Sequence, residues 1–461
     1  MAASDPALWT TTEQAAAIRR RALGSVELLD AQLSRIERLD GDVNAVCTLV
    51  ADAGREGAIA ADQATARGEF RGPLHGIPVT VKDAIATKGI RSTGGAEALF
   101  HHVPQHDAQV VTAIKDAGAI VIGKTNVPLW SGDFQSFNPM FGTTNNPWDL
   151  SRVPGGSSGG AAAAVACGMT SFEIGTDIGG SVRVPAAFCG VYGHKPSFGV
   201  VPTLGYLDEP NGGLTESDVN VFGPIARSVP DLQLLLDVLA APTADRAVGW
   251  RLDLPRPDVS ALRSLRIAAW FHEPSLPMDR EMISVLDGVA DRLVEAGLSV
   301  DRRARPDIDF AKSWISGAWL IGAATRVSDG GRDDPHTDWL FADRERARRR
   351  LQWAQFFEKV DVLLCPVTST PAFPHHQEGT WETREIVINK TAVPYLTLEA
   401  WPALIGSVYL PSTSAPVGRT AGGLPVGVQV VSPFLHDYRS IAVAGLITEL
   451  VGGYTVPPMA V

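Results

Sequence analysis

The stretch that decides the fold is RVPGGSSGGAAAAVACG, residues Arg152–Gly168. Two serines, Ser157 and Ser158, lie between two pairs of glycines, and an alanine-rich run follows them. Alanine is the strongest helix former and glycine is favoured just past a helix end, so the pattern predicts a helix that ends at Gly168. Serine hydroxyls at a helix start cap free backbone N–H groups. We therefore predict a turn followed by a capped helix, and not a flexible linker.

A second unusual stretch follows directly, EIGTDIGGSVRVPAAFCG, residues Glu173–Gly190. A short strand leads into a turn with two successive glycines, Gly179 and Gly180, and Ser181 comes directly after them. Glycines let consecutive backbone N–H groups point into one concavity, which suits a negatively charged oxygen. A serine hydroxyl beside such a turn is what acyl transfer requires, so Ser181 is a candidate nucleophile. A plain tight turn is the structural alternative.

Two short patterns match known functional motifs but stand in a sequence context that does not fit those motifs. Gly118–Thr125 matches the phosphate loop GxxxxGK[ST], but the residues between the glycines are Ala-Ile-Val-Ile, which predict a buried strand, and Pro128 follows where a helix should run. Gly155–Gly159 matches the nucleophile turn GxSxG, but the polar stretch NNPWDLSRVP stands where that turn needs an apolar strand. We reject nucleotide binding at the first pattern and give little weight to a Ser–His–Asp site at the second.

Predicted helices and strands alternate along the chain. Gly76–Asp83 and Ala119–Gly123 read as strands, and Ala108–Gly118 between them reads as an amphipathic helix. This alternation predicts an α/β fold with a largely covered sheet. Further strands are expected at Leu265–Trp270, Asp361–Val367 and Gly423–Val431, and a further helix at Arg280–Gly297. The charge run Asp343–Gln352 predicts a solvated helix face with a Glu345–Arg349 pair.

Composition and charge narrow the class of protein. Of the 461 residues, 45% are hydrophobic and 20% charged, as in a soluble globular protein. The net charge of -11 argues against nucleic acid as a partner, because phosphate-backbone binding needs a basic face. The four cysteines lie far apart without metal-ligand spacing, so no metal or cofactor is expected. The N-terminus lacks the features of a signal peptide and no run is long enough to span a membrane, so we expect a cytoplasmic protein.

These motifs together resemble the amidase signature family. The resemblance rests on GGSSGG and GTDIGGSVRVPAAFCGVYGHKPS, and also on GPLHGIPVTVKD, GAIVIGKTN, FGTTNNPWD, GPIARSVPDLQLLLDVL and GLPVGVQVVSPFLHD. It covers residues from about 30 to 235 and resumes after about 360. It implies an α/β fold with a central mixed twisted β-sheet covered by helices on both faces. It also implies a single domain, residues 1–461, with a signature core at about 70–235 and a variable substrate-side region at about 241–360.

The resemblance also implies a serine hydrolase that uses no histidine. By motif position, Ser181 is the nucleophile, Ser157 the bridging serine in a cis peptide with Gly156, and Lys82 the base. The resemblance further implies an oxyanion hole of the backbone N–H groups of Ile178, Gly179, Gly180 and Ser181, and supporting roles for Ser158, Asp177 and Arg183. The separations of 75 and 24 residues between the three catalytic positions fit the family layout. A lysine acts as a base only when its amine is neutral, and burial favours the neutral amine by lowering its pKa.

The substrate is the least determined part of this prediction. After Asn126 the chain carries aromatic residues where many family members have acidic and small ones. We therefore expect a pocket for small apolar, aryl or lactam-type amides, with ester or carbamate activity from the same acyl-enzyme. The candidate pocket residues are Trp130, Phe134, Phe137, Trp314 and Trp319.

Two other functions are carried as alternatives. One is the glutaminase subunit of a tRNA-dependent amidotransferase, whose partners would be protein and tRNA. The other is a non-enzymatic binding module, which is hard to reconcile with all three catalytic positions being present. For the main hypothesis we expect a small-molecule amide as partner, neither nucleic acid nor membrane, and a homodimer as the assembly to test.

Overall fold

An eight-stranded mixed sheet forms the centre of the chain in the computed structural model, which describes residues 5–210, 212–325 and 335–461. The strand order is β10-β9-β11-β15-β14-β7-β8-β6. The first three strands run parallel and the other neighbours pair antiparallel. The strands are β6 (Glu173–Asp177), β7 (Tyr192–Lys195), β8 (Val221–Ala226), β9 (Arg266–Ala269), β10 (Ser299–Asp301), β11 (Val362–Pro366), β14 (Ser412–Arg419) and β15 (Pro425–Val431).

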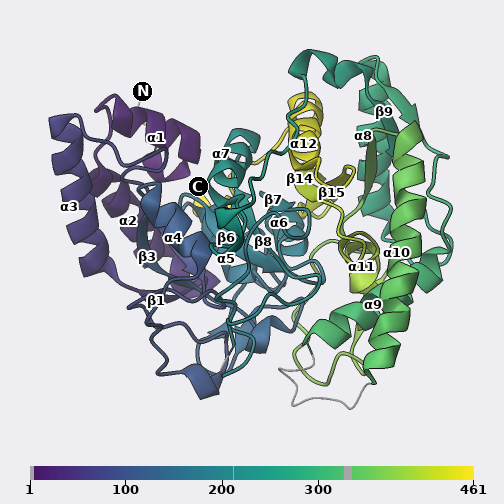
Figure 1. Ribbon diagram of the computed structural model, residues 1–461, viewed down its shortest axis with the longest axis horizontal. Coiled ribbons are helices and arrows are strands. Elements are labelled where there is room, and N and C mark those ends of the chain that lie inside the picture. Colours follow the sequence, from purple (N-terminus) through teal and green to yellow (C-terminus); the bar gives the residue numbers. More distant parts are fainter. Residues whose placement is uncertain (1–4, 211, 326–334) are drawn as a thin grey trace.

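Helices cover both faces of this sheet, as Figure 1 shows. The helices α5 (Gly159–Cys167) and α6 (Arg183–Cys189) pack on one face. The helices α7 (Val229–Leu239), α8 (Arg280–Glu295) and α12 (Asp437–Val451) pack on the other. Every residue of β8, β11 and β15 is buried, which agrees with the mainly hydrophobic runs at these strands. The predicted mixed sheet with helices on both faces is confirmed.

A separate three-stranded sheet carries the predicted lysine. Its order is β1 (Val46–Leu49), β3 (Ile120–Thr125) and β2 (Pro78–Lys82), and β2 lies against β6 of the large sheet. The residues of the phosphate-loop pattern form β3, and Lys124 is buried with its Nζ donating to Ile85 O at 2.5 Å. The predicted strand is therefore confirmed, and residues 120–125 of the pattern do not form a loop. The helices around this sheet are α1 (Thr11–Arg19), α2 (Ser25–Val43), α3 (Ala51–Arg67) and α4 (Gln109–Asp116).

The later part of the chain forms the opposite end of the molecule from α1–α4 (Figure 1). It contains the helices α9 (Phe310–Thr325), α10 (His336–Lys359) and α11 (Ala400–Gly406), and the hairpin β12 (Glu385–Ile388) and β13 (Thr391–Pro394). Two short strands, β4 (Phe137–Asn138) and β5 (Gly142–Thr143), form a further hairpin in the first half of the chain. No helix within the described residues is both long enough and apolar enough to cross a membrane.

One prediction about the charge run on α10 is wrong. Glu345 pairs with Arg348 and not with Arg349. Arg349 turns inward and donates to Ser313 O of α9 at 3.0 Å, and Arg346 is buried against Asp218. The packing of α10 on α9 therefore buries cations that the sequence pattern alone assigns to solvent.

Candidate active site

The buried amine of Lys82 collects three hydroxyl groups from motifs far apart in the sequence. Lys82 ends β2, and its Nζ lies 2.6 Å from Ser157 Oγ, 3.0 Å from Ser158 Oγ and 2.6 Å from Thr176 Oγ1. Thr176 belongs to β6, which lies beside β2. All four side chains are buried. The structure thus brings the end of β2, the serine loop (residues 155–160) and strand β6, which leads into the glycine turn (residues 178–181), to one point.

The environment of Lys82 favours the neutral amine. Burial lowers the pKa of Lys82 to about 7, while the negative charges of Asp177 and Glu173 act in the opposite direction. Lys82 donates to no carboxylate among the described residues. Asp83, the next residue in sequence, hydrogen-bonds to Thr93 instead, as the alternation of side chains along a strand predicts. A lysine with this pKa can accept a proton near neutral pH.

The serine loop positions two hydroxyls on the amine. The Gly156–Ser157 peptide is cis, as the resemblance implies. The predicted capping by Ser158 is wrong, because its side chain makes no cap hydrogen bond to α5. Its hydroxyl accepts from Lys82 and donates to Thr176 O at 3.4 Å. The predicted end of α5 at Gly168 is confirmed, with a φ of 69°.

The glycine turn after β6 contains backbone N–H groups that have no acceptor among the described residues. Gly179 and Ser181 are partly exposed, whereas the lysine cluster is not. The N–H of Gly180 donates to Asp177 Oδ1 at 2.9 Å and is therefore already used. The N–H groups of Ile178, Gly179 and Ser181 donate to no acceptor within the described part of the chain. Of the four amides in the predicted oxyanion hole, three remain available to an incoming oxygen.

A buried ion pair fixes the shape of this turn. Asp177 and Arg183 form two hydrogen bonds at 2.8 and 2.9 Å, and both side chains are fully buried. Burial raises the pKa of Asp177, but the charge and hydrogen bonds of Arg183 outweigh it and hold the pKa at about 2. Arg183 also donates to Pro402 O and Gln429 Oε1, so the pair joins the turn to α11 and β15. This placement agrees with the supporting roles expected for both residues.

The five aromatic residues expected to line a pocket belong to different parts of the packing. Phe134 is a core residue that packs against Trp381 and Tyr395. Trp130 packs in a separate small cluster, and Trp314 lies against clusters around the large sheet and α11. The partly buried residues Phe137 and Trp319 lie on β4 and α9. The structure therefore does not gather the five into one aromatic cluster.

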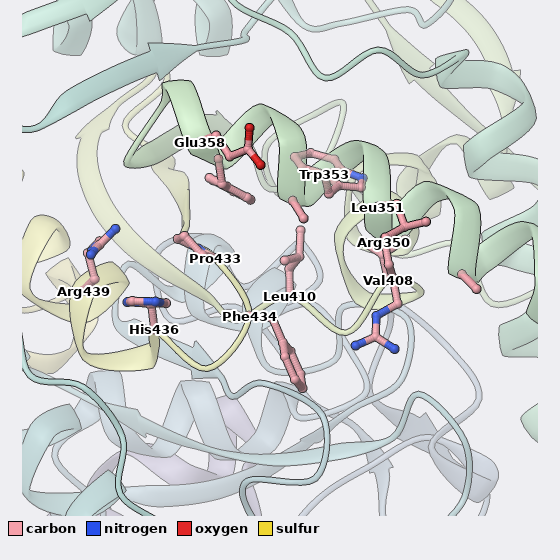
Figure 2. Close-up of a pocket in the computed structure, with 13 residues that line it drawn as sticks. Arg350, Leu351, Trp353, Glu358, Val408, Leu410, Pro433, Phe434, His436 and Arg439 are labelled. Carbon is pink, nitrogen blue, oxygen red and sulfur yellow. The ribbon is translucent and has the colours of Figure 1, made fainter.

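A large cavity lies apart from these residues, between α10 and the segment that follows β15 (Figure 2). Its volume is about 760 Å³, and its apolar lining includes Trp353, Phe357 and Leu410. None of the five aromatic candidates and none of the hydroxyls around Lys82 lines it. This cavity is therefore not the pocket expected from the sequence.

Sequence reasoning missed two residues of the site. Thr176 stands inside the GTDIGGS motif, so its contact with Lys82 could have been anticipated from the alternation of β6. Glu399 lies just before α11 and outside every motif, and nothing in the sequence indicates its place. A Cβ added to Gly179 would lie 3.2 Å from Glu399 Oε1, so this carboxyl adjoins the glycine turn. Burial raises the pKa of Glu399 to about 7.

Comparison with known proteins decides the family. A sequence model of the Amidase family matches residues 27–337 and 330–440. The chain belongs to the Amidase family. As an Amidase family member it is an amidohydrolase, an enzyme that cleaves amide C–N bonds. The resemblance inferred from the motifs is thereby confirmed.

Individual relatives of this Amidase family member differ in what their names say they act on. It is 32% identical to a glutamyl-tRNA(Gln) amidotransferase subunit of Anaeromyxobacter sp. (strain K), over 97% of each protein. It superposes on a bacterial aryl acylamidase of the amidase signature family with a TM-score of 0.86, 25% identity and 98% coverage of both chains. The corresponding glutamyl-tRNA(Gln) amidotransferase subunit from Thermotoga maritima gives a TM-score of 0.79 at 25% identity, covering 99% of both chains.

Proposed function

We propose that the chain hydrolyses a carboxylic amide through an acyl-enzyme on Ser181, with Ser157 as the proton bridge and Lys82 as the base. The observation that carries this proposal is the buried amine of Lys82, which has Ser157 Oγ at 2.6 Å and no carboxylate bonded to it in the part of the chain that the structure describes. A buried neutral lysine in contact with a serine is a base and not an ion-pair partner. No group of three or more side chains suited to a metal ion occurs among residues 5–210, 212–325 and 335–461.

In the acylation step the proton moves inward as the new bond forms. Ser181 Oγ attacks the amide carbon, its proton passes to Ser157, and the proton of Ser157 passes to the neutral amine of Lys82. The carbonyl oxygen gains the negative charge and accepts hydrogen bonds from the amides of Ile178, Gly179 and Ser181. Each such donor contributes roughly 3–4 kcal/mol to the stability of the transition state.

Collapse of the tetrahedral intermediate returns the proton. The C–N bond breaks, and the proton held on Lys82 passes through Ser157 to the leaving nitrogen, which departs as ammonia or an amine. Water then attacks the ester on Ser181 through the same relay and releases the carboxylic acid. The partial exposure of Ser181 beside a fully buried relay agrees with this sequence of steps.

The position of Glu399 favours an amide that carries an amino group, as glutamine does, over a plain aryl or lactam amide. The carboxyl adjoins Gly179, and no donor among the described residues hydrogen-bonds to it. Burial raises the pKa of this carboxyl to about 7, so it is partly neutral at that pH, and the ammonium group of a bound substrate would favour its charged form. The names of the amidotransferase relatives agree with this second candidate, glutamine hydrolysis within a larger complex. Because a similar solved structure is an aryl acylamidase, hydrolysis of aryl amides, the first candidate, is also tested.

The test is a hydrolysis screen of the purified full chain over glutamine, anilides, alkyl amides, lactams and carbamates. Ser181→Ala is expected to abolish every activity found, by about 10⁴-fold or more, while the protein still melts cooperatively. Ser440→Ala serves as a matched control, because Ser440 is also buried and hydrogen-bonded but lies on α12. Activity that survives in Ser181→Ala would overturn the proposed mechanism. Glutamine hydrolysis only on addition of partner proteins would support the second candidate.

A further inference from the structure

Ser136 is a fully buried residue that touches the serine loop at three points. Its Oγ lies 3.1 Å from Gly155 O and 3.2 Å from Ser157 O, and it accepts the N–H of Gly159 at 3.0 Å. The hydroxyl therefore contacts the backbone on both sides of the Gly156–Ser157 peptide. It also takes the helix-capping place at α5 that the sequence assigns to the serines of the loop itself.

The backbone of residues 133–136 packs directly against the serine loop, and we call this segment the wall. A Cβ on Gly156 would collide with the backbone of Asp133, Phe134 and Gln135, so the two segments are in direct contact. A Cβ on Gly159 would collide with Ser136 Oγ itself. The serine loop thus has no room to move toward this wall, and Ser136 supplies the hydrogen bonds that keep it from moving away.

The wall is itself held from the far side by the later part of the chain. Asp133 is buried and bonds to Arg384 and to Tyr395 OH, the latter at 2.5 Å. Gln135 donates to His376 O at 2.6 Å and accepts from His376 N at 2.9 Å. The buried side chains of Asp133 and Gln135 thus each make two of these hydrogen bonds, and such a network makes the segment rigid. Ser136 therefore extends from a fixed support.

We propose that Ser136 is a positioning residue that fixes Ser157 Oγ on the amine of Lys82. This inference rests on the proposed function, because it requires Ser157 to carry the proton. Among the described residues Ser136 forms no hydrogen bond to Lys82. It acts on Ser157 through the backbone carbonyls of Gly155 and Ser157. If Ser136 only stabilised the fold, its substitution would have the same effect on the rate whether or not Ser157 is present.

The expected effect of Ser136→Ala is a loss in kcat with KM unchanged. Removing the hydroxyl takes away the acceptor of the Gly159 N–H and the single O–H that Gly155 O and Ser157 O share, and the loop can then shift relative to Lys82. A misplacement of this kind costs about tenfold to hundredfold in rate. Ser136→Cys, which keeps the size but weakens the hydrogen bonds, is expected to fall between the wild type and Ser136→Ala. This second variant serves if Ser136→Ala does not fold.

The deciding experiment is a double-mutant cycle between Ser136 and Ser157 in the full chain. The readouts are hydrolysis and the rate at which a fluorophosphonate probe labels Ser181, with melting temperature measured in parallel. If Ser136 acts through Ser157, its substitution lowers both rates in the wild type and changes them less than about twofold in the Ser157→Ala background. Its effect on melting temperature is the same in both backgrounds.

Two results would overturn the inference. One is an equal fractional loss of rate in both backgrounds, which would mean that Ser136 acts independently of Ser157. The other is a Ser136 variant with wild-type rates. Failure of the proposed function itself is seen separately, because it requires the Ser181→Ala protein to remain active. Ser440→Ala controls for loss of a buried serine that lies away from the site.

Discussion

The signature core, residues about 70–235, and the later part of the chain, residues 241–406, contribute to the same site in different ways. The core supplies every group that would exchange a proton or bond with the amide: Lys82, Ser157 and Ser181. The later part supplies neighbours such as Glu399, Pro402 and Arg384, which contact the glycine turn or the wall behind the serine loop. In the proposed function, the reacting groups thus lie in compact motifs, whereas the neighbours of the glycine turn are side chains that folding brings from a distance.

Charges in the two regions also differ in burial. The Asp177–Arg183 pair of the core is fully buried, and its carboxyl accepts backbone N–H groups as well. The Glu345–Arg348 pair on α10 leaves more than half of each side chain exposed. A buried pair cannot lose one member without leaving an uncompensated charge, whereas water compensates an exposed one. The two pairs therefore provide a direct test of the comparison.

The largest expected effect is on stability when the buried pair is broken. Arg183→Met leaves Asp177 charged and buried, so the free energy of unfolding should fall by about 3–5 kcal/mol. Arg348→Met, the matched change on α10, should leave it unchanged within error, because Arg348 is exposed. Urea denaturation followed by circular dichroism measures both. Equal effects of the two changes would break the comparison between a buried core and an exposed helix.

The sequence predicted the core well because its signals are local. Strand β2 and the end of α5 at Gly168 follow from short patterns in which neighbours in sequence are neighbours in space. The roles of Lys82, Ser157 and Ser181 rest on the family resemblance, and the contact between Lys82 and Ser157 joins residues that are 75 positions apart. Three features could not be predicted this way. Ser158 turns to Lys82, Arg349 turns inward, and Glu399 reaches the glycine turn because of packing between segments far apart in the chain.

The second prediction concerns the pH dependence of activity, which tests whether Lys82 of the core acts as the base. The pKa of Lys82 is lowered to about 7, so the amine is neutral above that pH and protonated below it. Activity should therefore fall as the pH falls through 7, to about one hundredth at pH 5. Burial raises the pKa of Glu173 itself to about 7, so this carboxyl carries only part of its charge there, and Glu173→Gln should move the midpoint to lower pH by a small amount. A kcat profile that stays flat between pH 5 and 9 would contradict a lysine base.

The smallest expected effect tests the later part of the chain. Glu399→Gln keeps the size of the side chain and removes its charge, so it should lower kcat/KM for amides with an amino group by about tenfold, mainly through KM. Anilides, which lack an ammonium group, should be hydrolysed as well as before or better, because a buried carboxyl no longer needs a partner. With anilides, whose binding does not use the charge of Glu399, the acid limb near pH 7 should remain, because it belongs to Lys82. If instead the limb disappears and the preference among amides stays the same, Glu399 takes part in proton transfer, and the division between a reacting core and a recognising later part is wrong.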